Sequence, residues 1–132
     1  MKNMMLNKKN ISPLESEEQE RFFEWVESNC NKYTELNLCF ASMAGIRLTP
    51  GLAKKAKKQG NRAGVPDIIF PVPKKGYHGL FIELKRRRGY KVSVIQKEWI
   101  ETLNGLGYCA DVCYGSDDAI LLMKKYIGID LY

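Results

Sequence analysis

Apolar residues near the start of the chain recur at three- and four-residue intervals, a pattern that predicts an amphipathic helix. Ser12 can cap this helix, with Pro13 at its first position. Phe22 and Val26 lie on one face and should pack on a core. Glu15 continues that face beyond its apolar part, toward the ends of the strands described next. Most other acids of this helix are expected to be solvated.

Short apolar runs bounded by glycine, proline and polar residues predict four strands, at 36–44, 68–70, 80–85 and 108–114. The second and third are separated by the turn Pro73-Lys74-Lys75-Gly76 and can pair as a hairpin. Helical patterns cover 52–60, 94–106 and 117–126. The order of elements therefore predicts an α/β protein with a mixed sheet flanked by helices.

The predicted helices have recognisable ends and faces. Ser93 and Ser116 are the expected caps of the last two helices. In the lysine-rich helix we expect two residues to face inward, namely Leu52 and Ala56. In the helix after Ser93, the side chains expected to face the core are Ile95, Trp99, Ile100 and Leu103.

The hairpin carries the acidic residues of greatest chemical interest. Side chains alternate between the faces of a strand, so Glu83 and Lys85 point the same way and Leu84 points into the opposite layer. Asp67 immediately precedes its strand, and pairing of the hairpin would bring it beside Glu83. The purely structural alternative is a salt bridge between Glu83 and Lys85, which is a common arrangement and contributes little to stability at a surface.

Two carboxylates and an ammonium group at the end of a small sheet suit a divalent cation held next to a phosphodiester. Asp67 and Glu83 would be direct ligands, and the carbonyl of Leu84 could supply a third oxygen. Lys85 could orient or deprotonate the attacking water, or balance charge in the transition state. Glu15 could complete the ligand set directly or through water.

Gln96 has two interpretations that the sequence does not separate. Ser93-x-x-Gln96 fits a capping box, which is a purely structural role. Alternatively, Gln96 could hydrogen-bond a site carboxylate, the attacking water or a phosphate.

Charge is unevenly distributed along the 132 residues. The net charge is +6, with acids concentrated at 15–27 and bases at 47–62 and 85–91. Such clustering favours a polyanionic partner, most simply DNA, although a solvated basic face is the alternative. The residues expected to contact phosphates are Arg47, Lys54, Lys55, Lys57, Lys58, Arg62, Arg86, Arg87 and Arg88.

Several classes of protein are disfavoured. The four cysteines include no C-x2-C pair and there is a single histidine, so a structural zinc site is not expected. No apolar run reaches the roughly 20 residues of a membrane helix. The polar first ten residues lack the apolar block of a secretory signal, and we expect a cytoplasmic protein without a membrane partner.

Taken together, these motifs resemble the VRR-NUC (virus-type replication-repair nuclease) branch of the PD-(D/E)XK nucleases. The resemblance runs from about residue 14 to residue 126. The segments that carry it are Glu15-x-x-x-Gln19, Asn61-Arg-Ala-Gly-Val-Pro-Asp67, Gly76-Tyr-His-Gly-Leu-Phe-Ile-Glu83-Leu-Lys85, Ser93-x-x-Gln96-x-x-Trp99, Gly107-Tyr108 and Val112-Cys113-Tyr114-Gly115.

This resemblance implies a restriction-endonuclease-like fold over residues 12–132, preceded by a flexible tail at 1–11. It also implies a Mg²⁺- or Mn²⁺-dependent endonuclease. The residues at the family's motif positions are Asp67, Glu83 and Lys85, with Glu15 upstream and Gln96 as the helical glutamine. Glu18 lies one turn further along and could replace Glu15.

Short free-standing members of this family look like virus-encoded nucleases that act on branched DNA, in the host cytoplasm. A subunit of this size that cuts a four-way junction on two strands would most simply be a homodimer. We therefore expect cleavage of Holliday junctions or similar structures. The alternatives are a DNA-binding module without cleavage activity, and a nuclease with a flap or sequence-specific substrate.

Overall fold

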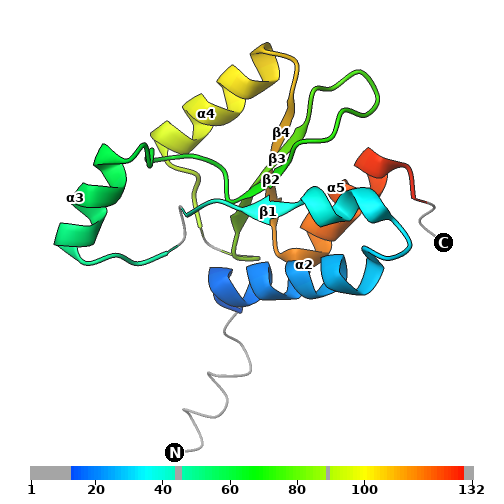
Figure 1. Ribbon diagram of the computed structural model, residues 1–132, viewed down its shortest axis with the longest axis horizontal. Coiled ribbons are helices and arrows are strands. Elements are labelled where there is room, and N and C mark those ends of the chain that lie inside the picture. Colours follow the sequence, from blue (N-terminus) through cyan, green and yellow to red (C-terminus); the bar gives the residue numbers. More distant parts are fainter. Residues whose placement is uncertain (1–12, 44–45, 89, 130–132) are drawn as a thin grey trace, which may run out of the picture.

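The computed structural model describes residues 13–43, 46–88 and 90–129 (Figure 1). The predicted N-terminal tail lies outside the described residues. In chain order the elements are α2 (Glu15–Asn29), a 3-10 helix η1 (Thr34–Leu38), β1 (Phe40–Ala41), α3 (Pro50–Lys58), β2 (Ile68–Phe70), β3 (Leu80–Lys85), α4 (Val94–Gly105), β4 (Cys109–Tyr114) and α5 (Ser116–Ile127).

Within the described residues, the strands form one mixed sheet in the order β1-β2-β3-β4. β1 and β3 both pair with β2 antiparallel, whereas β4 runs parallel to β3. The return from β3 to a parallel β4 passes through α4, as a parallel connection requires. The predicted mixed sheet flanked by helices is confirmed.

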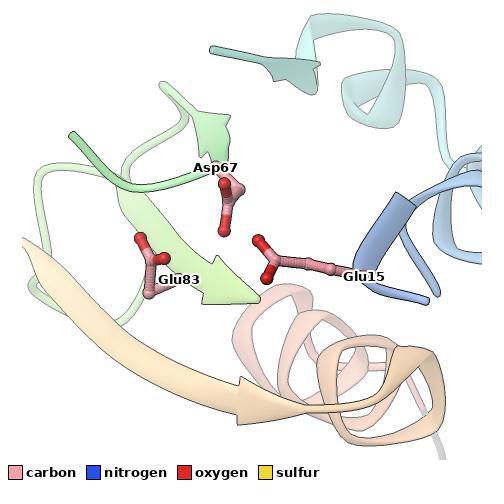
Figure 2. Close-up of side chains that lie close together, drawn as sticks. All are labelled: Glu15, Asp67 and Glu83. Atoms are coloured by element: carbon pink, nitrogen blue, oxygen red, sulfur yellow. The ribbon is translucent and has the colours of Figure 1, made fainter. Parts of the chain in front are cut away.

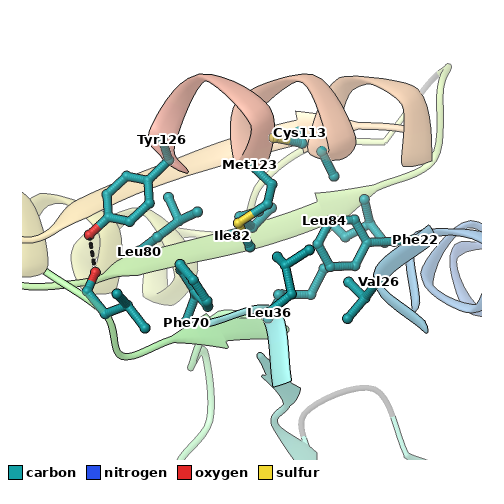
Figure 3. Close-up of a cluster of buried hydrophobic side chains, with 13 residues drawn as sticks. Phe22, Val26, Leu36, Phe70, Leu80, Ile82, Leu84, Cys113, Met123 and Tyr126 are labelled. Carbon is teal, nitrogen blue, oxygen red and sulfur yellow. Dashed lines mark hydrogen bonds between the residues drawn. The ribbon is translucent and has the colours of Figure 1, made fainter. Parts of the chain in front are cut away.

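The main hydrophobic core lies between the sheet and the pair of helices α2 and α5 (Figure 3). Phe22 of α2 and Met123 of α5 are fully buried there. Ile82 and Leu84 of β3 point into the same layer. Helix α4 lies on the opposite side of the sheet (Figure 1), so the residues of β3 between the core positions face α4.

The hairpin of β2 and β3 has the register that the sequence predicted. Ile68 pairs with Ile82 and Phe70 with Leu80. Continuing this antiparallel register by one step places Asp67 opposite Glu83. The site residues thus lie at the end of the sheet where β2 begins and β3 ends.

The outer edge of β4 is closed by side chains. Asn104 donates to the carbonyl of Ala110 and accepts from its N–H, both at 2.9 Å. The N–H of Val112 donates to the side chain of Asp111, and that of Tyr114 to Asp118. Because these alternate N–H groups are the ones that an additional strand would use, β4 offers little for sheet extension.

The start of the chain differs from the prediction. Helix α2 begins at Glu15 with Leu14 at the capping position, so Pro13 precedes the helix; Ser12 lies outside the described residues. The predicted strand over 36–44 is wrong for most of its described residues, because 36–38 belong to η1 and, within the described part of the range, only Phe40–Ala41 forms a strand paired with β2.

The other helices also show differences in their buried faces and caps. No residue of α3 is buried: Leu52, predicted to face inward, is exposed, and Ala56 is only partly buried. In α4, Leu103 is buried but Ile95 is half-exposed. Ser116 is not a cap: Gly115 occupies that position with a φ of 90°, and Ser116 donates its hydroxyl to Glu18. Among the described residues, no helix is both long and apolar enough to cross a membrane.

Candidate active site

Three carboxyl groups from distant parts of the sequence converge at one end of the sheet (Figure 2). Glu15 comes from the first residue of α2, Asp67 precedes β2, and Glu83 lies in β3. Each offers an oxygen within 4.8 Å of the other two. Asp67 and Glu83 are only 4% and 2% exposed. This acidic cluster brings together the three acids that the sequence singled out.

The side chain of Asp67 is fixed by a hydrogen bond from the backbone of β3. The N–H of Leu84 donates to Asp67 Oδ2 at 2.8 Å. In an extended strand the carbonyl of a residue points to the same side as its N–H, so the Leu84 carbonyl also faces the side of Asp67. This is the oxygen that the sequence analysis proposed as an additional ligand.

The loop that delivers Asp67 is packed tightly on α4. Gly64 has a φ of 83°, and a Cβ there would lie 2.2 Å from Ile95 Cγ2 and 2.9 Å from Trp99 Cδ1. Trp99 Nε1 donates to the carbonyl of Ala63 at 2.9 Å. Both the positive φ and the close approach require glycine at this position, so the Gly-Val-Pro-Asp sequence has a local structural cause.

Gln96 performs both of the roles considered for it. Its Oε1 accepts from the N–H of Ser93 and the Ser93 hydroxyl accepts from the N–H of Gln96, which together form a capping box. Its Nε2 donates to Glu83 Oε1 at 2.8 Å. The cap therefore fixes the amide so that its remaining end orients the carboxylate.

Lys85 forms an ion pair with Glu83, with 3.7 Å between Lys85 Nζ and Glu83 Oε1. It is only 9% exposed, so water screens its charge poorly. Glu83 and Lys85 share a face of β3 while Leu84 is in the core, as the alternation predicted.

Burial and mutual repulsion make ionisation of the acidic cluster costly. Burial, then the charge of Asp67, raise the pKa of Glu83 to about 8, although Lys85 acts in the opposite direction. Burial also raises the pKa of Asp67, against the stabilising hydrogen bond from Leu84. The pKa of Glu15 is raised by its partial burial and by Asp67. A positive charge placed among these groups would remove the repulsion.

The donor set of the acidic cluster fits a hard divalent cation. All of its side-chain donors are carboxylate oxygens, the ligands that Mg²⁺ and Mn²⁺ prefer over sulfur or imidazole. One of them, Glu15, is only partly buried, which leaves the cluster open on one side to a substrate. The residues therefore fit a resident Mg²⁺ or Mn²⁺.

Glu18, the alternative to Glu15, is engaged elsewhere. It is fully buried, and Arg87 donates to both of its oxygens, at 2.9 and 3.3 Å. Ser116 donates to it as well, and Arg21 lies 3.6 Å away. Glu18 is therefore an exception to the expectation that most other acids of this helix are solvated. Its position four residues before Phe22, on the same helical face, was the signal that could have revealed its burial.

The predicted phosphate contacts fall into two groups. Residues that are exposed and occur in α3 or the neighbouring loops are Arg47, Lys54, Lys55, Lys57, Lys58 and Arg62. The arginines after β3 differ among themselves. Arg88 is exposed, whereas Arg87 is bound to Glu18 and Arg86 Nε donates to the carbonyl of Pro13 at 3.0 Å.

A mixed sheet between helices, with a PD and E-x-K constellation at one end, defines a nuclease-like α/β fold. Comparison with known proteins agrees with this class. The VRR-NUC domain model matches residues 4–117. A solved structure described as a VRR_NUC domain protein is 33% identical, with a TM-score of 0.75, and the match covers 90% of this chain and 92% of that one. No curated protein shows significant similarity. The chain belongs to the VRR-NUC domain family of nucleases.

Proposed function

We propose that this protein is a divalent-metal-dependent DNA endonuclease whose active site comprises Glu15, Asp67, Glu83, Lys85 and Gln96. The observation that carries the proposal is the convergence of three carboxyl groups, two buried and one partly buried, within 4.8 Å of one another. A fold gains no stability from grouping acids whose ionisation is so costly. A role in holding a cation next to a substrate phosphate explains the cluster.

Asp67, Glu83 and Glu15 would hold Mg²⁺ or Mn²⁺, with the Leu84 carbonyl as a further oxygen. When bound, such a cation withdraws charge from the phosphate and lowers the pKa of a coordinated water. The hydrogen bonds from Leu84 and Gln96 fix the orientation of Asp67 and Glu83 before the substrate arrives.

Lys85 is assigned a role in orienting the attacking water and in neutralising charge on the phosphate. Its ammonium group lies beside Glu83 in a poorly screened position, where it can orient the water or offset the negative charge that develops in the transition state. Phosphodiester hydrolysis needs an acidic side chain and an ammonium group on one face. DNA binding alone does not need the acidic side chain.

The test compares end-labelled four-way junction, flap and linear duplex DNA, each with Mg²⁺, with Mn²⁺ and with EDTA. We expect cleavage with either metal, and binding without cleavage in EDTA. Equal cleavage in EDTA would contradict the metal-dependent mechanism. Binding without cleavage under every condition would instead favour the alternative of a DNA-binding module.

We further propose that the substrate is branched DNA and that the active form is a homodimer acting on Holliday-type junctions. Exposed lysines and arginines on α3 and the adjacent loops support grip on the phosphate backbone rather than on base edges. Two sites related by symmetry would suit paired cuts. Because the outer edge of β4 is closed, the dimer contact is expected on another surface.

Light scattering of the free protein, together with cleavage of the three DNA substrates, tests this finer assignment. A dimer that cuts the junction faster than duplex or flap is expected. A monomer, or a preference for the flap or for one duplex sequence, would contradict it while leaving the nuclease proposal intact.

A further inference from the structure

We propose that a groove beside Glu15 binds unpaired nucleotides of the substrate next to the phosphate that is cut. The inference rests on the proposed nuclease function and deepens it, because it names the feature of branched DNA that the site would recognise. The groove has a volume of about 750 Å³, within the range of roughly 300–1,000 Å³ typical of pockets for small ligands.

The groove starts at the acidic cluster. Glu15 contributes both to the cluster and to the wall of the groove. The other walls come from segments far apart in sequence: α2, the residues that follow β1, and the residues that follow β3. A nucleotide in the groove would therefore be directly connected to the phosphate at the carboxyl groups.

Apolar and aromatic side chains line the groove where it opens to solvent. Met43, Ile46 and Tyr90 are each about half exposed. Exposed apolar groups gathered in a concave site usually mark a binding surface. The faces of nucleobases are apolar enough to cover such side chains.

Arg47 and Arg86 line the groove together with two acids, Glu15 and Glu20, and Arg86 contributes a stacking surface. The Arg86 guanidinium lies 4.7 Å from the centre of the Tyr90 ring and also donates to the Tyr90 hydroxyl. Nε of Arg86 is fixed by the carbonyl of Pro13. Aromatic rings and guanidinium planes are the platforms on which unpaired bases stack. Arg47, which is exposed at the rim, suits an adjacent phosphate.

A groove of this kind would select DNA by whether its bases are paired or unpaired. In a duplex both faces of a base are covered by its neighbours, so a base can enter the groove only after it leaves the stack, which costs free energy. Nucleotides at a branch point incur less of this cost. A second copy of this chain is the other candidate occupant, but the continuity of the groove with the acidic cluster and the stacked Tyr90 and Arg86 side chains favour a nucleotide.

The test measures binding in EDTA by fluorescence anisotropy, with a ten-nucleotide oligothymidylate and a duplex of the same length as probes. Tyr90→Ala should weaken binding of the oligothymidylate roughly tenfold, and weaken duplex binding far less. Tyr90→Phe should retain most of the affinity, because the ring remains. Tyr77→Ala, a change of a similarly exposed tyrosine in the β2–β3 loop, is the matched control and should behave as wild type.

Ile46→Glu provides a second variant at an exposed position where folding is not at stake. The added negative charge should weaken oligothymidylate binding more than duplex binding. The inference is overturned if Tyr90→Ala and Ile46→Glu affect both probes equally or neither probe. It is also overturned if they convert a dimer to a monomer in light scattering while oligothymidylate affinity is kept, which would assign the groove to a second copy.

Failure of this inference is distinguishable from failure of the proposed function. The binding assay contains no metal and requires no cleavage. If the wild-type protein cuts DNA with Mg²⁺ but both groove variants bind both probes normally, only the groove assignment fails. If the groove variants lose oligothymidylate selectively but no metal supports cleavage, the nuclease proposal fails and the single-strand site remains.

Discussion

Asp67 and Glu83 combine deep burial with an unfavourable electrostatic environment. The sequence indicated that they are neighbours, because the hairpin turn and strand alternation fix the register of a short antiparallel pair. It could not indicate how far each is removed from water, because that depends on α4 and α2 covering the end of the sheet. Gln96 illustrates the same limit: its capping role follows from spacing, and its bond to Glu83 follows only from tertiary packing.

Replacing Asp67 with asparagine should separate cleavage from binding. Asp67→Asn is expected to lower the cleavage rate by at least about a hundredfold, because a metal ligand is removed. DNA affinity in EDTA should be kept or improved, because a charge that repels phosphate is removed. Single-turnover cleavage and anisotropy measure the two effects, with Asp111→Asn, at an exposed position of β4, as the control. Loss of folding in Asp67→Asn would make this residue structural instead.

The raised pKa values predict how stability of the metal-free protein depends on pH. The pKa of Glu83 is raised from 4.5 to about 8, so folding favours its protonated form. This contribution to stability is complete below pH 4.5 and is lost as pH rises to about 8. Asp67 and Glu15 shift in the same direction.

In EDTA, the melting temperature should therefore fall between pH 5 and pH 8, and Mg²⁺ should recover part of the loss at pH 8. Glu83→Gln should flatten the dependence, because the substituted amide does not titrate. A melting temperature that rises from pH 5 to pH 8 in EDTA, with no response to Mg²⁺, would contradict the assigned electrostatics.

At the scale of elements, prediction succeeded for most of the chain and failed for the apolar run at 36–44. The β2–β3 hairpin, α4, β4 and α5 were placed to within a residue or two. The apolar run at 36–44 was assigned to a strand, but Leu36 is buried whereas Leu38 and Phe40 are half-exposed. An apolar run alone does not distinguish a 3-10 turn under a helix from a strand in the sheet.

The ion pair that ties α2 to the end of β3 predicts a loss of stability. Arg87→Ala would leave the buried Glu18 without its main partner, and we expect the free energy of unfolding to fall by about 2 kcal/mol. This figure lies at the low end for buried pairs because Arg87 is 40% exposed and Ser116 still donates to Glu18.

Urea unfolding measures this change, and Arg88→Ala, at the next and exposed position, is the control with an expected effect within about 0.5 kcal/mol. If Arg87→Ala weakened DNA binding without changing stability, the contact to Glu18 would not be the main role of Arg87.

Helix α3 should contribute to DNA binding through its charge alone. It has no buried residue, so replacing Lys54, Lys55, Lys57 and Lys58 with alanine should leave folding intact. DNA affinity should fall, and the slope of log affinity against log salt should decrease by up to about 0.9 for each phosphate that the variant no longer neutralises. The matched control replaces Lys124 and Lys125 on α5, at the opposite side of the molecule (Figure 1). An unchanged salt slope would exclude α3 from the DNA interface.

At the scale of the whole molecule, the fold gathers groups that no single segment contains. Glu15 and Glu83 are far apart in sequence and meet because α2 packs across the end of the sheet (Figure 2). The sequence placed Glu15 there through the face it shares with Phe22. The groove beside it was not foreseen, because its walls come from the ends of three separate elements and carry no shared pattern.

The central claim is that Glu15, Asp67 and Glu83 hold one site for a divalent cation. Its most direct test is calorimetric titration of Mn²⁺ at pH 7 into the wild-type protein, into Glu15→Gln, Asp67→Asn and Glu83→Gln, and into Asp111→Asn as a control. Wild type and the control should bind Mn²⁺ with release of protons, whereas each variant of the acidic cluster should bind at least about tenfold more weakly. Equal Mn²⁺ affinity in wild type and all three cluster variants would contradict the claim.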